Sequence, residues 1–450
     1  MRNAHLIVFA IVALFLSSCE AFVDSYRDFS DFSGFGTKEE ILPGEREKAF
    51  KTASDGSDQG EGAKPVVLSK PYTNTEWTHE GGNPQHRVYH VNLRDKPKVA
   101  WSASIGRGST KRRKLVAQPI VKNNVVFTMD ATSKVTAFNL ANGKSYWNRD
   151  LVPLSERDGY FGGGIAYFKG ALFITTGFAE IHSLSAREGA GRWRKPLPAP
   201  SRAAPTVSGG LVFVVTIDNQ VLAFDVIDGK EVWKHQGAKS QTSLLGGSSP
   251  AVHGNTVLVG LSSGEVLALD AETGRVLWSD SLSPFGGGSE ALLSTISAVK
   301  AAPVIDRNFA FVLSHAGRMA AFDFLRGVQV WESEVGGQQS PAVGPDHVFV
   351  ITAQGRMAAL ERTTGVARWV RELSKFENRQ KTRAITWYGP VLAGNKLVLA
   401  SSHGLMAYVS PYSGKVIGIE KLGTAVVTSP IVVNNTLLIL NENGRLIAYR

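Results

Sequence analysis

Residues 249–279 read SPAVHGNTVLVGLSSGEVLALDAETGRVLWS, and this stretch contains the pattern on which the fold depends. Short runs of apolar residues alternate with polar ones and are separated by turn signals, among them the glycines at 254, 264 and 274. Such alternation is typical of half-buried β-strands. The stretch therefore predicts one unit of four short strands, which runs from Pro250 to Trp278, 28 residues later.

The same spacing recurs along the chain. Prolines at 119, 205, 303 and 341 lie 28 residues before the tryptophans at 147, 233, 331 and 369. Two further units keep the spacing with one residue changed, since Ile165 precedes Trp193 and Gly418 follows Pro390. A glycine stands four residues before each Trp position, at 143, 189, 229, 274, 327, 365 and 414. Glycine fits there because a tight turn needs a positive φ.

An eighth unit begins at Pro430, and its Trp position would fall beyond Arg450. The stretch KPKVAWSASI at 96–105 matches the missing strand. We therefore expect an all-β fold over residues 97–450, an eight-bladed β-propeller of four-stranded blades whose N-terminal strand completes the last blade. The tryptophans are expected to pack between neighbouring blades, and they are Trp101, Trp147, Trp193, Trp233, Trp278, Trp331 and Trp369.

The N-terminus reads MRNAHLIVFAIVALFLSSC, with an apolar run from Leu6 to Leu16. This run is shorter than the roughly 20 residues that a bilayer-spanning helix needs, so residues 1–18 are predicted to be a signal peptide. Residues 16–19 resemble the bacterial lipoprotein box, which implies cleavage before Cys19 and acyl chains, palmitate among them, on that residue. Glu20 favours the outer membrane over the inner one. A plain secretory signal is the alternative.

Residues 19–96 are predicted to be a lipid-anchored flexible tether followed by an N-terminal segment. The polar, Gly- and Ser-rich composition up to about Lys64 favours the tether. His79, His86 and His90 lie close together farther on, which is compatible with a metal site or with ordinary loop histidines. We expect loop histidines and no metal, because no Cys or carboxylate accompanies them at ligand spacing.

The formal net charge of +10 permits attraction to anionic surfaces, and a solvated basic surface is the simpler interpretation. Basic residues cluster at 111–114 and 375–383, where they could face anionic lipid, an acidic partner or solvent. No nucleic-acid recognition motif is present, so nucleic acid is not an expected partner. Gly260-Leu-Ser262-Ser-Gly264 satisfies the GxSxG pattern of hydrolases, but another predicted strand follows it, which indicates a hairpin turn.

The (T/D)GxxxW pattern, as in Asp228 to Trp233 and Thr273 to Trp278, resembles the PQQ-type propeller repeat. Two functional classes share this repeat, the quinoprotein dehydrogenases and the BamB-like lipoproteins of the outer-membrane β-barrel assembly machinery. The resemblance implies that the quinone enzymes hold their cofactor against a disulfide of adjacent cysteines. This chain has a single Cys, so we expect no cofactor.

All length variation between units falls in the connections from each Trp to the next Pro, and variation on one face is typical of a binding surface. In BamB-like proteins the corresponding loops dock a periplasmic POTRA domain of the barrel-forming subunit. That resemblance suggests partner contacts at Leu244 and Leu245. The longest connection adds apolar candidates, which are Phe285, Leu292 and Leu293. Packing of these side chains on the propeller rim is the alternative.

The resemblance implies a non-enzymatic scaffold on the periplasmic face of the outer membrane. It would be held to the bilayer by its acyl anchor, bind the barrel-forming subunit and assist insertion of outer-membrane proteins. Unfolded outer-membrane proteins are further candidate partners. Two alternatives stay open. One is a periplasmic PQQ-dependent quinoprotein dehydrogenase or a degenerate relative of one, and the other is a propeller that binds cell-wall or surface polymers.

Overall fold

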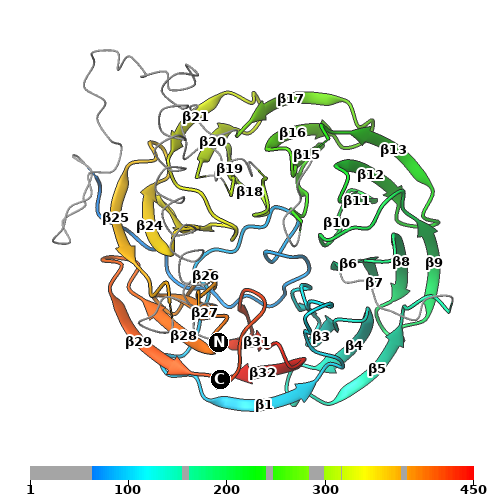
Figure 1. Cartoon of the computed structure of the whole chain (residues 1–450), viewed down its shortest axis with the longest axis horizontal. Helices are drawn as coiled ribbons and strands as arrows, with labels where there is room; N and C mark the ends of the chain where they lie inside the picture. The colour runs from blue at the N-terminus through cyan, green and yellow to red at the C-terminus, as the bar shows by residue number, and fades with distance from the viewer. Residues whose placement is uncertain (1–62, 155–161, 240–246, 283–297, 316, 377–382) are drawn as a thin grey trace, which may run out of the picture. The chain divides into compact units, whose positions relative to one another are not determined.

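The computed structural model describes residues 63–154, 162–239, 247–282, 298–315, 317–376 and 383–450. The chain divides into two compact units, Met1–Ala49 and Phe50–Arg450, and the first lies outside these residues. The described part of the second unit forms eight four-stranded sheets around a common axis (Figure 1). The predicted all-β, eight-bladed propeller is confirmed. Within the described ranges no helix is long and apolar enough to cross a membrane.

The first four sheets, blades 1 to 4, follow each other along the chain. Blade 1 contains β2 (Ile120–Lys122), β3 (Val125–Met129), β4 (Lys134–Asn139) and β5 (Ser145–Asp150). Blade 2 contains β6 (Gly163–Phe168), β7 (Ala171–Thr176), β8 (Glu180–Ser185) and β9 (Gly191–Pro196). Blade 3 contains β10 (Thr206–Ser208), β11 (Leu211–Val215), β12 (Gln220–Asp225) and β13 (Glu231–Gln236). Blade 4 contains β14 (Ala251–His253), β15 (Thr256–Gly260), β16 (Glu265–Asp270) and β17 (Val276–Ser281).

Blades 5 to 8 continue in the same order. Blade 5 contains β18 (Val304–Asp306), β19 (Phe309–Leu313), β20 (Met319–Asp323) and β21 (Gln329–Ser333). Blade 6 contains β22 (Ala342–Val343), β23 (His347–Ile351), β24 (Arg356–Glu361) and β25 (Ala367–Glu372). Blade 7 contains β26 (Trp387–Ala393), β27 (Lys396–Ser401), β28 (Leu405–Val409) and β29 (Val416–Lys421). Blade 8 contains β30 (Ile431–Val433), β31 (Thr436–Leu440), β32 (Arg445–Tyr449) and, paired with β32, β1 (Val99–Ser104).

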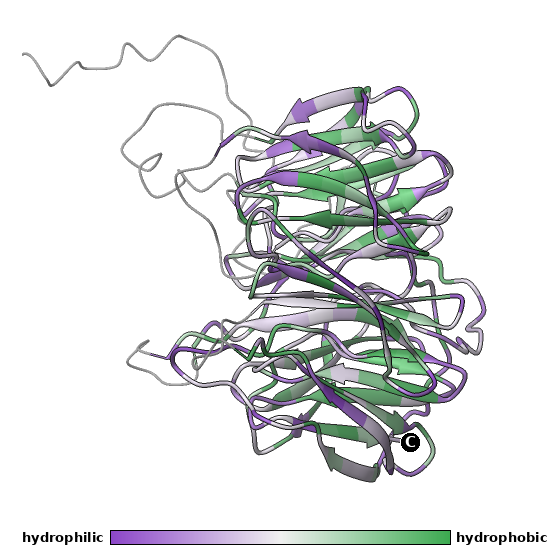
Figure 2. Cartoon of the chain, turned by 90° about the vertical axis from the view of Figure 1, so that its right-hand side faces the viewer, coloured by the Kyte–Doolittle hydropathy of each residue, from purple (hydrophilic) through white to green (hydrophobic). Residues whose placement is uncertain are grey.

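The apolar pattern of each strand matches its distance from the axis. Middle strands such as β7, with the sequence ALFITT, are buried along their whole length. Outer strands such as β9, with the sequence GRWRKP, alternate between exposed and half-buried side chains. Hydrophobic residues accordingly concentrate within the blades, while hydrophilic ones colour the turns and outer strands (Figure 2). Burial of apolar side chains between facing blades supplies the core.

Each tryptophan of the repeat lies on an outer strand and reaches the next blade. Its indole Nε1 donates a hydrogen bond of 2.8 to 3.2 Å to a carbonyl in the turn before the next outer strand. The seven carbonyls belong to Leu140, Ala186, Val226, Ala271, Phe324, Arg362 and Pro411. The ring of each tryptophan also covers the glycine of that turn. These contacts join neighbouring blades around the circle.

Gly418 replaces the tryptophan in blade 7, and blade 8 gives the physical reason. The outer strand of blade 8 is β1, which follows no turn from β32, so the carbonyl and glycine that a tryptophan would contact are absent there. Backbone hydrogen bonds between Lys98 and Arg450, of 2.7 and 2.8 Å, hold the two strands together instead. The Arg450 guanidinium also donates to the Leu140 and Ala141 carbonyls of blade 1.

The antiparallel order gives the propeller two distinct faces. The connection face carries the links between blades, such as 105–119, and the turns between second and third strands. The hairpin face carries the turns between first and second strands, such as 123–124, and those between third and fourth strands. This division places all the variable connections on one face.

Candidate binding cavity at the propeller axis

The innermost strands present their free edges to the axis, and residues 77–91, here called the axial segment, bind those edges (Figure 1). Unpaired strand edges leave backbone groups without partners, so such cover is stabilising. Trp77 exchanges two backbone hydrogen bonds with Val121 of blade 1, of 2.8 and 2.7 Å. Further backbone bonds join the axial segment to blades 2, 4, 5 and 7, through Tyr167, Val252, Ile305 and Leu392. The tether predicted up to about Lys64 lies almost wholly outside the described residues.

Two histidines of the axial segment are buried between the inner strands rather than lying in a solvated loop. The Val207 amide donates to Nε2 of His79 at 3.1 Å, and Nδ1 of His86 donates to the Pro303 carbonyl at 2.9 Å. Burial lowers the pKa of His79 to about 3, helped by the nearby His86, and burial lowers the pKa of His86 to about 4. Both imidazoles are therefore neutral at pH 7.

His90 is also buried, so the expectation of loop histidines for this stretch differs from the structure in exposure. Its Nδ1 donates to the Ser69 carbonyl at 2.7 Å, and its Nε2 accepts from the Asn395 amide at 2.9 Å. Each of the three histidines thus hydrogen-bonds to the main chain. In the part of the chain that the structure describes, no group of three or more His, Cys, Asp or Glu side chains could hold a metal ion.

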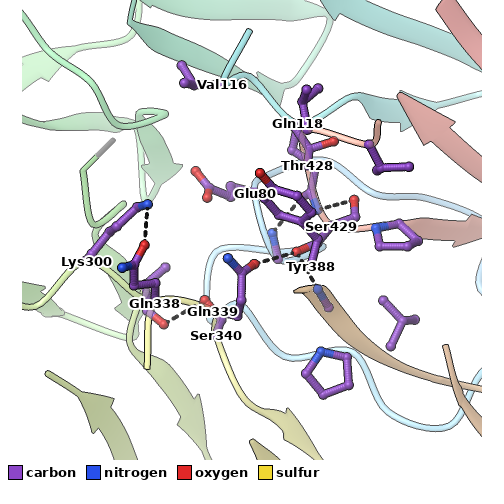
Figure 3. Close-up of a pocket in the computed structure, with 18 of the residues that line it drawn as sticks. Glu80, Val116, Gln118, Lys300, Gln338, Gln339, Ser340, Tyr388, Thr428 and Ser429 are labelled. Carbon is purple, nitrogen blue, oxygen red and sulfur yellow. Dashed lines mark hydrogen bonds between the residues drawn. The ribbon is translucent and has the colours of Figure 1, made fainter. Parts of the chain in front are cut away.

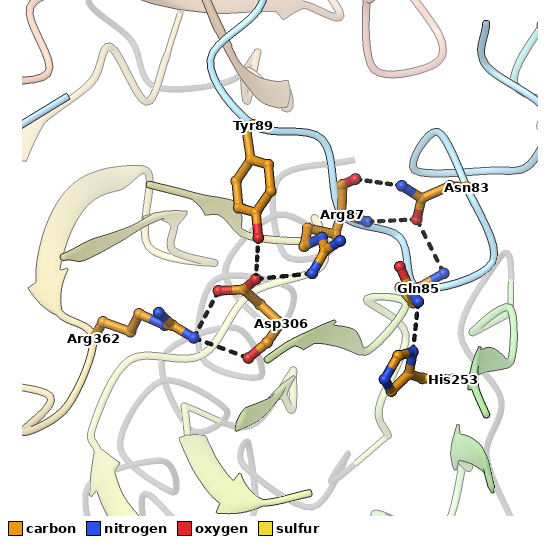
Figure 4. Close-up of polar contacts among 7 residues, drawn as sticks. All are labelled: Asn83, Gln85, Arg87, Tyr89, His253, Asp306 and Arg362. Atoms are coloured by element: carbon orange, nitrogen blue, oxygen red, sulfur yellow. Dashed lines mark hydrogen bonds and ion pairs between the residues drawn. The ribbon is translucent and has the colours of Figure 1, made fainter. Parts of the chain in front are cut away.

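A buried carboxylate fixes the axial segment to blades 5 and 6 (Figure 4). Asp306, at the end of β18, accepts a hydrogen bond of 2.5 Å from the Tyr89 hydroxyl. It also forms ion pairs with Arg87, at 3.2 Å, and with Arg362 of blade 6, at 2.7 Å. A carboxylate that is fully withdrawn from solvent needs such partners. Two of the three come from the axial segment, so this cluster joins that segment to the blades.

A cavity of about 420 Å³ lies between the axial segment and the connection face (Figure 3). This volume is within the range of small-ligand sites. The axial segment contributes Trp77, Glu80, Gly81, His86 and Val88 to its lining. The blades contribute residues that precede or begin their innermost strands, among them Gln118, Gly247, Lys300, Gln338, Gln339, Ser340, Tyr388, Thr428 and Ser429.

Amide side chains hold the cavity wall together. The Gln118 Oε1 atom accepts from Nε1 of Trp77 at 3.2 Å and from the Gly81 amide at 3.0 Å. The hydroxyl of Ser429 donates to Oε1 of Gln339 at 3.1 Å. These bonds join the axial segment to blade 1 and blade 8 to the residues before blade 6. The wall is therefore a network between separate parts of the chain.

Glu80 and Lys300 bring opposite charges to the cavity (Figure 3). The Ser249 hydroxyl donates to Oε2 of Glu80 at 2.7 Å, and Nζ of Lys300 donates to Oε1 of Gln338 at 2.8 Å. Burial raises the pKa of Glu80 and lowers the pKa of Lys300, and each charge partly offsets the shift of the other. The two side chains are not joined as an ion pair, and each hydrogen-bonds to a neutral neighbour instead.

The partner contacts predicted from the sequence, Leu244, Leu245, Phe285, Leu292 and Leu293, lie outside the described residues, as does Cys19. The described residues that follow the two connections do have a place. Gly247 and Lys300 both line the cavity, and so does Lys114 of the basic stretch 111–114. The connections singled out by their length therefore lead directly into the cavity wall.

Ser262 of the GxSxG pattern lies in the turn between β15 and β16. Its hydroxyl donates to Oδ1 of Asn219 at 2.8 Å, and a strand follows it instead of the helix that a nucleophile elbow requires. Sequence reasoning missed Glu80, Lys300 and the glutamines of the cavity. A signal for the first was present, because the stretch EWTHEGGNPQHRVYH at 76–90 is too aromatic for a solvated tether.

A family model described as "Outer membrane protein assembly factor BamB" matches residues 131–371 and 327–450. A protein of that name from Moranella endobia is 24% identical over 357 residues, which cover 78% of this chain and 89% of the relative. Another of that name, from Salmonella typhimurium, is 28% identical over 360 residues, which cover 78% of this chain and 88% of the relative.

Solved structures show the same fold. BamB from Moraxella catarrhalis matches with a TM-score of 0.65 and 22% identity, over 79% of this chain and 100% of that one. A europium-containing methanol dehydrogenase matches with a TM-score of 0.64 and 14% identity, over 81% of this chain and 89% of that one. At these identities the likeness concerns the fold alone, which assembly factors and dehydrogenases share.

Proposed function

The chain belongs to the family of the outer membrane protein assembly factor BamB, and on that premise we propose that it is a non-enzymatic scaffold of the outer-membrane β-barrel assembly machinery. It binds the periplasmic POTRA domains of the barrel-forming subunit and assists insertion of outer-membrane proteins. The observation that carries this proposal is the family match across the propeller, from residue 131 to residue 450.

The proposed place of action is the periplasmic face of the outer membrane. The signal predicted at 1–18 would be removed and Cys19 acylated, so that the bilayer holds the chain through its lipid. Stable anchoring takes more than one acyl chain. Residues 20–62 would then connect the lipid to the propeller.

The proposed docking surface is the connection face. Leu244, Leu245, Phe285, Leu292 and Leu293 all belong to links between blades, and the described ends of those links line the axial cavity. A rigid propeller that presents apolar side chains at this face would orient a mobile partner domain without bond chemistry. Unfolded outer-membrane proteins are a second proposed class of partner for the same face.

The test is co-purification of the full-length chain from detergent-solubilised envelopes. Replacing Leu244 and Leu245 together by Asp should reduce recovery of the barrel-forming subunit by about tenfold or more, since apolar anchors carry most of an interface's energy. Thermal unfolding should stay unchanged. The matched control is Ile227→Asp, which changes an exposed aliphatic residue in a hairpin-face turn. Equal recovery with the double variant and the wild type would remove the two leucines from the interface.

A further inference from the structure

The axial cavity combines two demands that its own residues do not meet. On the floor, Glu80 offers carboxylate oxygens, and Nε2 of His86 is buried without a hydrogen-bond partner among the described residues. Because Nδ1 of His86 donates to Pro303, Nε2 of the neutral ring is an acceptor. Both floor groups therefore call for hydrogen-bond donors, since a buried polar group without a partner is destabilising.

The wall calls for the opposite kind of group. Lys300 has one hydrogen bond in the cavity, to Gln338, and an ammonium group can donate three. Its positive charge is partly withdrawn from water, which favours an anionic neighbour. The buried hydroxyl of Thr428, also in the lining, has no partner among the described residues either. A cavity occupant should thus supply donors to the floor and a negative charge to the wall.

The surroundings of the cavity add positive charge. Lys114 and Arg202 line it together with Lys300, whereas its acidic lining residues are Glu80 and Glu442. Lys111 and Arg112 are exposed beside Lys114 on the same connection. A cationic rim raises the local concentration of anionic ligands and speeds their association.

We propose that the axial cavity binds an extended acidic peptide segment of a partner protein, with a carboxylate side chain on Lys300 and main-chain N–H groups on Glu80 and His86. A peptide carries both kinds of group at close spacing, whereas a simple anion offers no donors to the floor. The side chains of Gln338 and Gln339, each with a donor and an acceptor, suit the same main chain. The proposed function supplies a partner protein as the source of the segment.

The test uses purified protein and the fluorescein-labelled peptide GSEVESG, with GSQVQSG as its neutral counterpart. Fluorescence anisotropy should show binding of the acidic peptide that is at least about tenfold tighter than binding of the neutral one. Lys300→Met should weaken binding of the acidic peptide by about tenfold, because it removes the anchoring charge while keeping the length of the side chain. Thermal unfolding of this variant should not occur at a lower temperature than in the wild type.

The matched control is Lys230→Gln, which changes an exposed lysine of a hairpin-face turn and should leave binding unchanged. Substituting Lys111 and Arg112 by Gln should reduce the association rate and its dependence on salt. Equal affinity for the two peptides, unchanged binding by the Lys300→Met variant, or no binding of either peptide would overturn the proposal. So would displacement of the peptide by inorganic phosphate as effective as displacement by unlabelled peptide. A negative result here would leave recovery of the barrel-forming subunit intact, so the two proposals can fail separately.

Discussion

The indole of Trp233 lies so close to Gly274 of the next blade that a Cβ atom on that glycine would come within 2.6 Å of the ring. Gly274 also has a φ of +70°, in the left-handed region. Two separate restrictions therefore require glycine at this turn, one from the backbone and one from the neighbouring blade. The same pairing occurs at all seven tryptophans of the repeat.

Gly274→Ala should destabilise the propeller more than a glycine substitution that strains only the backbone. Gly254 is the control, because its φ is +58° and nothing lies within 4 Å of a Cβ built on it. Overpacking against Trp233 should make the free energy of unfolding about 1–3 kcal/mol lower for Gly274→Ala than for Gly254→Ala. Urea denaturation measures the difference. Equal values for the two variants would show that contact with the indole adds nothing.

Asp306→Asn should loosen the axial segment. The substitution removes the negative charge that Arg87 and Arg362 share, and breaking a buried ion pair costs about 3–5 kcal/mol. Hydrogen exchange of the amides bonded to the segment, such as Val252 and Ile305, should become faster. The exposed Asp228→Asn serves as the control. Unchanged exchange in the Asp306 variant would mean that the cluster does not hold the segment in place.

Acid should destabilise the protein through His79 and His86. Their folded-state pKa values of about 3 and about 4 lie below the ordinary value of 6.5, so the unfolded chain binds more protons between these limits. Stability is then fully present above about pH 6.5 and is lost as the pH falls toward 4, with a slope of up to about 2.7 kcal/mol per pH unit for two protons. A protonated His79 could no longer accept from the Val207 amide.

Denaturation curves at several pH values test this dependence. The double variant His79→Gln and His86→Gln should be less stable at pH 7, because two buried hydrogen bonds are disturbed, but its stability should vary less between pH 6.5 and 4. A double variant with the same slope as the wild type would assign the pH dependence to other groups.

Cys19→Ala should abolish membrane anchoring, because Cys19 is the chain's single cysteine and the proposed site of acylation. Labelled palmitate should enter the wild type and not the variant, and fractionation should show loss of the variant from outer membranes. The distant Ser57→Ala in the proposed tether is the control. Palmitate incorporation into the Cys19 variant would contradict the assignment.

The blades could be predicted from the sequence because each repeats one local pattern. The 28-residue distance from Pro250 to Trp278 spans four strands whose turns are marked by glycine. Gly274 was expected for its backbone conformation, and the structure adds its contact with Trp233. That second reason is invisible in sequence because the two residues belong to different blades.

The cavity could not be predicted, since its residues share no spacing. Glu80 belongs to the axial segment and Lys300 to a connection before blade 5, and they meet only because the segment binds the inner strand edges. The histidines of that segment were noticed, but burial depends on the same long-range pairing. Periodicity reports neighbours in a blade, whereas the axis gathers residues from every part of the chain.

The central claim is that the chain works within the outer-membrane assembly machinery, and its most direct test is affinity purification of the tagged full-length protein from mildly solubilised envelopes. Mass spectrometry identifies the partners that remain bound. We expect the barrel-forming subunit in near-stoichiometric amount, and its loss when Leu244 and Leu245 are both changed to Asp. Recovery of the protein without that subunit, at a wild-type level of expression, would contradict the proposed function.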